Sequence, residues 1–158
     1  MNIINIDSSV YRECINSYIR HLWGGPMMVT NGNLYDTCNL PGFVADDDGA
    51  LLGAVLYRPY RDECEVSALF SLVQGIGVGT KLLDSVSEMA KSNGTHRIWL
   101  VTTNDDTQAI RFYQKYGFDL KAVHIGAIEL ARKLKNELPT IGNDNIPIKH
   151  EFEFEMFL

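Results

Sequence analysis

Three glycines at a strand-to-helix junction limit the fold of this chain more than any other feature. The segment reads Gln74-Gly-Ile-Gly-Val-Gly-Thr80, and it follows an extended apolar run from residue 64 to residue 73. Beyond it, apolar side chains recur with a helical period at Leu82, Leu83, Val86, Met89 and Ala90. The glycines leave backbone N–H groups uncovered at the start of this helix, where the helix dipole also favours negative charge. The segment therefore predicts a strand, an anion-binding turn and a helix.

The spacing of the glycines narrows the choice of anion. The dinucleotide fingerprint G-x-G-x-x-G is not met, because the glycines fall as G-x-G-x-G. The phosphate loop of nucleotide hydrolases needs Gly-Lys-Ser/Thr, whereas Gly79 is followed by Thr80 and then Lys81. Taken alone, this segment is equally compatible with a glycine-rich turn that binds no ligand.

Length and cysteine usage indicate the broad class of protein. A chain of 158 residues has room for one domain with a real core, so we expect residues 1–158 to form a single domain. No apolar run reaches membrane-spanning length, and the first residues lack the pattern of a secretory signal. Cys14, Cys38 and Cys64 form no C-x-x-C pair, which predicts free thiols and no metal site. We therefore expect a cytoplasmic protein with no membrane partner.

The charge balance indicates which kinds of partner the chain is suited to bind. Fourteen basic residues against twenty acidic ones give a net charge of −6, and Lys and Arg form no large cluster. This balance argues against nucleic acid as the main partner. It is compatible with a cationic substrate such as an amine, although a solvated acidic surface is common in proteins of this charge.

Strand and helix patterns alternate along the chain. Strands are expected at residues 2–6, 42–45, 51–57, 63–72, 97–101, 118–123 and 151–157, and helices at about 10–22, 79–92, 106–117 and 127–134. We expect a long loop at 24–41, a break at Pro59, and one solvated face on the last strand, where Glu alternates with Phe and Met. The strand–helix–strand unit between 63 and 102 should be parallel, and the early strands antiparallel. The expected fold is α/β (α+β): a mixed, mainly antiparallel sheet with a central parallel pair and helices on both faces.

A second motif lies between residues 103 and 118. It reads Thr103-Asn-Asp-Asp-Thr-Gln-Ala-Ile-Arg-Phe-Tyr-Gln-Lys-Tyr-Gly-Phe118. Taken with Q-x-x-G-x-G at Gln74, Gly77 and Gly79, it resembles the GCN5-related N-acetyltransferase (GNAT) superfamily, whose members carry N-x(several)-A-x-x-F/L-Y-x-K-x-G-F after the fifth strand. The two motifs stand in the family's order, and the resemblance covers residues 40 to 125 well. Many members have Val-x-Pro before the glycine loop, where this chain has Ser71-Leu-Val73, so the end of that strand stays open.

The resemblance implies a cofactor site for acetyl-CoA. In the family, the two central parallel strands part and the pantetheine arm lies between them. The resemblance implies pantetheine contacts from the backbone of Ser67, Ala68 and Leu69. It implies a pyrophosphate loop made of Gln74, Gly75, Ile76, Gly77, Val78, Gly79 and Thr80. Asn104 would contact the cofactor near the fifth strand, and Tyr113 would lie near the thioester sulfur.

The implied reaction moves an acetyl group from acetyl-CoA to a primary amine, in a small molecule or a peptide, within a ternary complex. The amine must lose a proton before attack, since its pKa is about 10.4. Glu65 is our first candidate for that base and Glu63 the second, because both lie on the strand before the loop, although both could be plain strand carboxylates. Tyr113 could protonate the leaving thiolate, and on helical period alone it could equally be a core aromatic.

Three alternatives stay open. Cys64 could carry the acetyl group covalently, although a buried, inert thiol is the ordinary reading of such a cysteine. The domain could instead be a non-catalytic acyl-CoA sensor or structural domain, or a module that prefers ATP or NAD. The sequence is also compatible with a homodimer.

Overall fold

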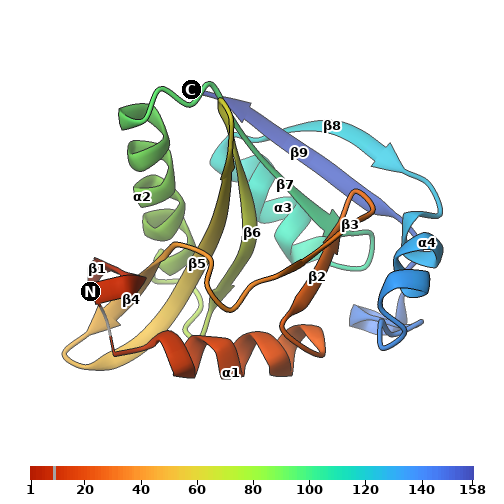
Figure 1. Cartoon of the computed structure of the whole chain (residues 1–158), viewed down its shortest axis with the longest axis horizontal. Helices are drawn as coiled ribbons and strands as arrows, with labels where there is room; N and C mark the ends of the chain where they lie inside the picture. The colour runs from red at the N-terminus through yellow and green to blue at the C-terminus, as the bar shows by residue number, and fades with distance from the viewer. Residues whose placement is uncertain (9) are drawn as a thin grey trace.

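The computed structural model describes residues 1–8 and 10–158, with one long sheet at its centre (Figure 1). The strands are β1 (Asn2–Asn5), β2 (Met27–Thr30), β3 (Asn33–Asp36), β4 (Gly42–Asp47), β5 (Ala50–Tyr60), β6 (Glu63–Ser71), β7 (Arg97–Thr103), β8 (Asp119–His124) and β9 (Glu151–Phe157). The helices are α1 (Arg12–Trp23), α2 (Val78–Ser92), α3 (Thr107–Tyr116) and α4 (Ala127–Leu134), with short 3-10 turns η1 (Ile6–Ser8) and η2 (Asn143–Asn145).

The sheet has seven strands in the order β1-β4-β5-β6-β7-β9-β8. Every neighbouring pair is antiparallel except β6 and β7, which the crossover through α2 makes parallel. The strands β2 and β3 form a separate antiparallel hairpin. The expected mixed sheet with a central parallel pair is confirmed.

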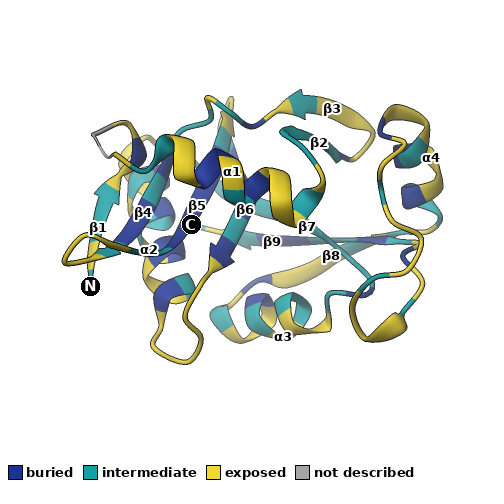
Figure 2. Ribbon diagram, turned by 90° about the horizontal axis from the view of Figure 1, so that it is seen from below, coloured by how far each residue is buried: buried dark blue, intermediate teal, exposed yellow. Residues whose placement is uncertain are grey.

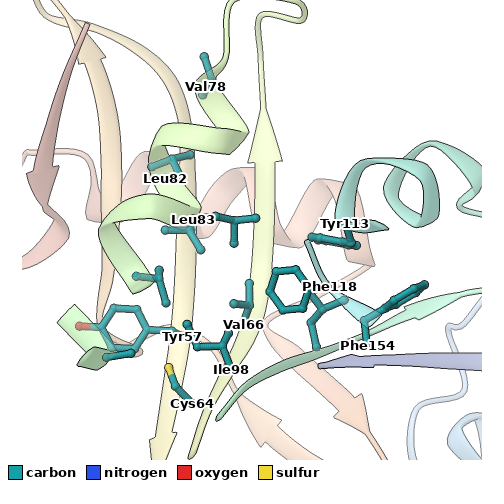
Figure 3. Close-up of a cluster of buried hydrophobic side chains, with 14 of the residues drawn as sticks. Tyr57, Cys64, Val66, Val78, Leu82, Leu83, Ile98, Tyr113, Phe118 and Phe154 are labelled. Carbon is teal, nitrogen blue, oxygen red and sulfur yellow. The ribbon is translucent and has the colours of Figure 1, made fainter. Parts of the chain in front are cut away.

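Two apolar clusters hold the layers together, one on each face of the sheet. The amphipathic face of α2 packs Leu82, Leu83 and Val86 against β5, β6 and β7, and Tyr113 of α3 joins the same cluster (Figure 3). On the opposite face, Ile15 and Ile19 of α1 pack against β4, β5 and the end of β6. Figure 2 shows the buried stripe of α1 facing the sheet. Helices therefore cover both faces, as expected.

The central parallel strands part from one another. They pair only at Glu63–Arg97, Cys64–Ile98 and Glu65–Trp99, although β6 continues to Ser71 and β7 to Thr103. On its other side β6 changes register against β5, where Leu56 pairs with Ala68 but Tyr57 pairs with Val66. Ser67 is thus the extra residue of a β-bulge, which bends and twists its strand. Beyond this bulge a gap opens in the middle of the sheet.

Three local expectations were wrong. The segment 24–41 is not a long loop, because residues 27–36 form the hairpin β2–β3 around a turn at Asn31 and Gly32, both with positive φ. Pro59 does not break its strand. The pairing of β4 with β5 ends at Gly42–Leu56, so Pro59 lies where β5 has only β6 beside it, and its missing N–H costs no ladder bond.

The third correction concerns β9, whose polar face is not solvated. Glu151 and Glu155 are buried, and Glu153 is half-buried. The hairpin β2–β3 and helix α4 lie over this side of the sheet, and α3 lies on the other (Figure 2).

No helix in the described part of the chain is long and apolar enough to cross a bilayer.

Candidate active site

The glycine loop presents uncovered backbone donors. Helix α2 begins after Gly77, whose φ of +80° is in the left-handed region, and no side chain caps it. The first hydrogen bond between the loop and the helix runs from the Lys81 N–H to the Gly77 carbonyl. Among the described residues, none accepts a hydrogen bond from the backbone N–H groups of residues 74–80. These amides can therefore bind an anion at the positive end of the helix.

A cleft of about 470 Å³ opens beside this loop. Its walls are the end of β6, the loop itself and the first turns of α3. The cleft brings together eight of the residues expected at the cofactor, namely Leu69, Gln74, Gly75, Gly77, Val78, Gly79, Thr80 and Tyr113. At Gly79 a Cβ would stand 3.0 Å from the ring of Phe112, so any other residue there would force that ring to shift slightly. The two motifs found in the sequence thus form opposite walls of one cleft.

Four expected cofactor residues lie outside the lining of this cleft. Ile76 is exposed on the loop, and Ala68 is buried against α1 in the second apolar cluster. Ser67 lines a neighbouring chamber at the gap in the sheet. Asn104 donates to the Pro147 carbonyl at 3.0 Å and accepts from the amides of 149 and 150 at 2.8 and 2.9 Å. Its side chain therefore holds the segment that leads into β9.

Tyr113 lies in the core and at the cleft at the same time. Its ring packs against Phe112, Phe118 and Phe154, with centroids 5.4, 5.8 and 6.3 Å away (Figure 3). Burial, and then the negative charge of Asp106, raise the pKa of Tyr113 well above its usual range. The hydroxyl therefore stays protonated at neutral pH and can act as a hydrogen-bond donor.

Glu65 lies on the other face of the sheet, and its carboxylate is already engaged. Oε2 accepts from Nε and Nη2 of Arg58 at 2.9 and 2.6 Å, and Oε1 accepts from the Tyr35 hydroxyl at 3.0 Å. The Arg58 guanidinium also stacks over the Tyr35 ring at 3.9 Å. This arrangement fixes Glu65 firmly but leaves it fewer free lone pairs for a substrate.

A groove of about 700 Å³ runs along this face. Glu63, Glu65 and Glu153 line it together with Arg58, Arg97 and the Trp99 ring. Arg97 bridges three carboxylates, those of Glu63, Glu153 and Glu155, at 3.0, 2.7 and 2.6 Å. The groove therefore combines an aromatic wall with a network of paired charges.

A smaller chamber of about 180 Å³ lies at the gap in the sheet. It continues the groove, because Ser67, Val101 and Glu151 in the chamber stand two positions along their strands from Glu65, Trp99 and Glu153 in the groove. Asp106 lines both this chamber and the loop cleft. The cleft, the chamber and the groove thus adjoin in that order.

Glu151 is the residue of this chamber that sequence reasoning missed. Its only signal in the sequence is the alternation of Glu along 151–155, a pattern that predicts a solvated strand face. In the structure its side chain is buried, and burial leads the causes that raise its pKa.

Cys64 faces the opposite way, into the cluster beneath α2 (Figure 3). Burial, and then the charge of Glu65, raise the pKa of the Cys64 thiol to about 12. A thiol in this state is a poor nucleophile at neutral pH. Within the described residues no group of His, Cys, Asp and Glu is arranged to hold a metal ion.

Comparison with known proteins identifies the family. The model of the acetyltransferase (GNAT) family matches residues 9–118. The uncharacterized protein YxbD of Bacillus subtilis (strain 168) is 35% identical over 152 residues, covering 96% of this chain and 95% of YxbD.

Solved structures share the fold at lower identity. An IAA acetyltransferase from Bacillus cereus ATCC 14579 has a TM-score of 0.74 at 21% identity, with 99% of this chain and 100% of that chain covered. A GNAT family acetyltransferase from Elizabethkingia anophelis, with acetyl-CoA bound, has a TM-score of 0.69 at 17% identity, with 99% of each chain covered. The chain belongs to the acetyltransferase (GNAT) family.

Proposed function

We propose that this protein is an acetyl-CoA-dependent N-acetyltransferase, which transfers the acetyl group directly to a primary amine of a small molecule or peptide. One observation carries the proposal. The gap between β6 and β7 adjoins an anion-binding cleft on one side and a charged groove on the other, with Asp106 lining both the cleft and the chamber between them.

In the proposed complex the loop amides of residues 75–80 bind the pyrophosphate, and the pantetheine arm enters the gap beside β6. Its amides then pair with the strand edge that β7 leaves uncovered past Glu65. The thioester comes to rest at the Ser67 bulge, between the two binding spaces. This arrangement supports attack on the thioester from the groove side of the sheet.

The proposed transfer has three steps, which are deprotonation of the acceptor, attack on the thioester and departure of CoA. The ammonium of the acceptor gives a proton to a carboxylate, and the neutral nitrogen attacks the thioester carbon. The C–S bond then breaks, and CoA leaves as a thiolate. A hydrogen bond from the Tyr113 hydroxyl stabilises this thiolate until it takes up the second proton of the attacking nitrogen, which forms the neutral amide and the CoA thiol, and the amide then leaves through the groove.

The state of Cys64 supports direct transfer over a covalent acetyl-enzyme. The thiol is buried, its pKa is raised to about 12, and it lines neither the cleft nor the chamber. In initial-rate kinetics we expect intersecting lines for a ternary complex, and parallel lines would instead support a covalent intermediate. The free thiols of Cys14, Cys38 and Cys64 suit the reducing cytosol in which we propose that the protein works.

Cofactor binding is tested by thermal shift with acetyl-CoA, ATP and NAD. Acetyl-CoA at a hundredfold excess over its Kd should stabilise the fold by about 2.7 kcal/mol, a rise of roughly 5–10 °C in Tm. ATP and NAD should give much smaller shifts. Gly77→Val should abolish the shift, because valine cannot hold the φ of +80° that shapes the loop.

Gly94→Val is the matched control, since Gly94 has a φ of +73° at the opposite end of the same helix. Both variants should lose similar stability, yet only Gly94→Val should keep the acetyl-CoA shift. A full shift in folded Gly77→Val protein would rule out the loop as the cofactor site. Binding of acetyl-CoA without amine-dependent release of CoA thiol, across a panel of amines, would indicate a sensor and not an enzyme.

A further inference from the structure

The three glutamates that share one face of β9 have different surroundings. Glu155 is paired with Arg97 and Lys121 at 2.6 and 3.2 Å. Glu153 is paired with Arg97 and with His124 Nε2 at 2.7 and 2.9 Å. Glu151 is only 3% exposed and forms no ion pair with any described residue; the Asn31 backbone gives its carboxylate one hydrogen bond, but its Oε2 has no hydrogen-bond partner among them. A buried carboxylate with no counter-ion and one unpartnered oxygen costs free energy, which is a common mark of a functional group.

The position of Glu151 is set by both neighbouring strands. It pairs across the ladder with Thr103 of β7 and with His124 of β8. Its side chain lines the chamber at the gap in the sheet, where the Ser67 bulge forms part of the facing wall. The chamber adjoins the cofactor cleft at Asp106. A group bound to Glu151 therefore stands on the side of the gap that faces the acceptor groove.

The charges around Glu151 come from five elements. Burial raises the pKa of Glu151, a hydrogen bond from the Asn31 backbone and the charge of His124 of β8 lower it, and the charges of Glu153 of β9 and Glu65 of β6 raise it again. Asp106, at the start of α3, and Lys135, after α4, share the chamber. Lys135 Nζ is committed to the carbonyls of Trp23 and Met27 at 2.5 and 2.8 Å. The one buried ammonium in the lining is thus occupied, and Glu151 remains available to a cationic ligand.

The size of the chamber limits what can reach Glu151. Its volume is about 180 Å³, close to the ~150 Å³ of a cavity that admits benzene. That space accommodates about six non-hydrogen atoms, enough for a small aminoalkyl arm but not for a much larger group. The body of a longer acceptor would lie in the groove beyond, against Trp99.

We propose that Glu151 receives the reacting ammonium and removes its proton, and that the chamber admits a small primary aminoalkyl group. The inference rests on the proposed acetyl transfer and assigns its acceptor side. The carboxylate takes one proton from R–NH₃⁺ and becomes a neutral acid, and the resulting R–NH₂ attacks the thioester carbon. As the C–S bond breaks, the nitrogen gives its second proton to the departing CoA thiolate, which forms the amide and the CoA thiol, and Glu151 returns its own proton to water. Glu65, held by Arg58 and Tyr35, shapes the groove in this scheme and transfers no proton.

The main test replaces Glu151 by Gln, which keeps the size of the side chain and removes its basicity. The probes are n-butylamine and 1,4-diaminobutane as unbranched acceptors, with 1-adamantylmethylamine as the oversized primary amine, in a thiol-release assay. We expect Glu151→Gln to lower kcat/KM for the unbranched amines at pH 7 by about 10²-fold or more. The loss should shrink as the pH approaches the pKa of the amine, because free amine then needs no base. The acetyl-CoA thermal shift should be unchanged.

Glu155→Gln is the matched control on the same strand and face, and it should leave the pH profile of kcat/KM unaltered. The two variants should also differ in stability without any substrate. Glu151→Gln removes a buried, unpaired charge and should raise Tm at pH 7, whereas Glu155→Gln loses its pairs with Arg97 and Lys121 and should lower it. A fall in Tm for Glu151→Gln would contradict an unpaired Glu151.

The outcomes separate the two proposals. If wild-type protein binds acetyl-CoA but acetylates no amine, the proposed function fails and the role of Glu151 fails with it. If wild type acetylates unbranched amines and Glu151→Gln matches it at every pH, only the role of Glu151 is overturned. Equal or faster acetylation of 1-adamantylmethylamine would overturn the size limit set by the chamber.

Discussion

Tyr113 shows how one residue can serve the core and the cleft together. Its ring is a core aromatic, while its hydroxyl is placed at the cofactor cleft. The raised pKa of this hydroxyl lies far above the value of about 8.5 typical of a thiol. Complete proton transfer to a thiolate would therefore be uphill, and a hydrogen bond is the contribution that the geometry favours.

We expect Tyr113→Phe to lower kcat by about 10²-fold, the low end of the range for a general acid, with little change in acetyl-CoA affinity. Because the ring contacts stay, Tm should change by no more than a few degrees. Tyr116→Phe is the control on the same helix, since its hydroxyl bonds to Asp84 at 2.8 Å. It should leave kcat unchanged. Equal kcat for Tyr113→Phe and wild type would reduce Tyr113 to a packing residue.

At the residue scale the sequence predicted the cofactor side better than the acceptor side. Gly75, Gly77 and Gly79 lie within five residues of one another, so their spacing could be compared directly with known anion loops. The partners of Glu65 could not be predicted, because Arg58 and Tyr35 reach it from separate strands. A period of two along β9 predicted a polar face, but whether water or protein covers that face depends on segments distant in the sequence.

At the element scale, the hairpin β2–β3 was the main fold feature missed. Asn31-Gly32 is one of the strongest short signals for a two-residue hairpin turn, and the turn has the expected positive φ at both residues. The flanking strands are only four residues each, so their alternation was too short to stand out. The hairpin forms part of the chamber wall through Met28 and Thr30, so missing it also hid the acceptor side.

The segment before β9 provides a prediction at the same scale. Asn104→Ala removes three hydrogen bonds to residues 147–150 and should destabilise the fold by about 1–3 kcal/mol. Since β9 carries Glu151, we also expect the KM for the amine to rise, while acetyl-CoA affinity stays within about twofold. Asn104→Asp keeps the acceptor oxygen for the amides of 149 and 150, and it should recover part of the stability.

Unfolding curves and acetyl-CoA titrations of both Asn104 variants decide between two roles. The family resemblance implies a contact with the cofactor, whereas the structure places the side chain on the loop backbone. A tenfold or greater loss of acetyl-CoA affinity, with Tm unchanged, would favour the contact with the cofactor.

At the scale of the whole molecule, one sheet joins both ends of the chain. The first strand, β1, forms one edge, and the last, β9, lies between β7 and β8 near the other. This supports our proposal that residues 1–158 act as a single domain. The parallel pair followed from the length of the 63–102 crossover. The insertion of β9 between β7 and β8 could not be predicted, because antiparallel neighbours separated by long segments leave no mark in a local pattern.

The charges on β9 lead to a prediction about acid stability. Burial alone would raise the pKa of Glu153, but hydrogen bonds from His124 and Arg97 outweigh it and lower that pKa below the ordinary 4.5. For Glu155 the hydrogen bonds from Arg97 and Lys121 likewise outweigh burial. The stability that these two carboxylates contribute is fully present above pH 4.5 and is lost as the pH falls through their lower folded-state values. Glu151 acts in the opposite sense, because a raised pKa penalises the fold at neutral pH and relieves it as the pH falls.

We therefore expect the Tm of the wild type to rise slightly from pH 7 into the mildly acidic range and then to fall steeply below about pH 4.5. Glu151→Gln should start higher at pH 7 and lack the rise, because it has no buried charge to relieve. Arg97→Gln should be less stable than the wild type at neutral pH and should lose less stability than the wild type below pH 4.5. The reason is that Glu63, Glu153 and Glu155 have already lost their shared partner. Calorimetric scans of the three proteins at half-unit steps from pH 3 to pH 8 make the comparison. A rise on the acidic side that persists in Glu151→Gln would assign it to another group and contradict a buried, unpaired charge at Glu151.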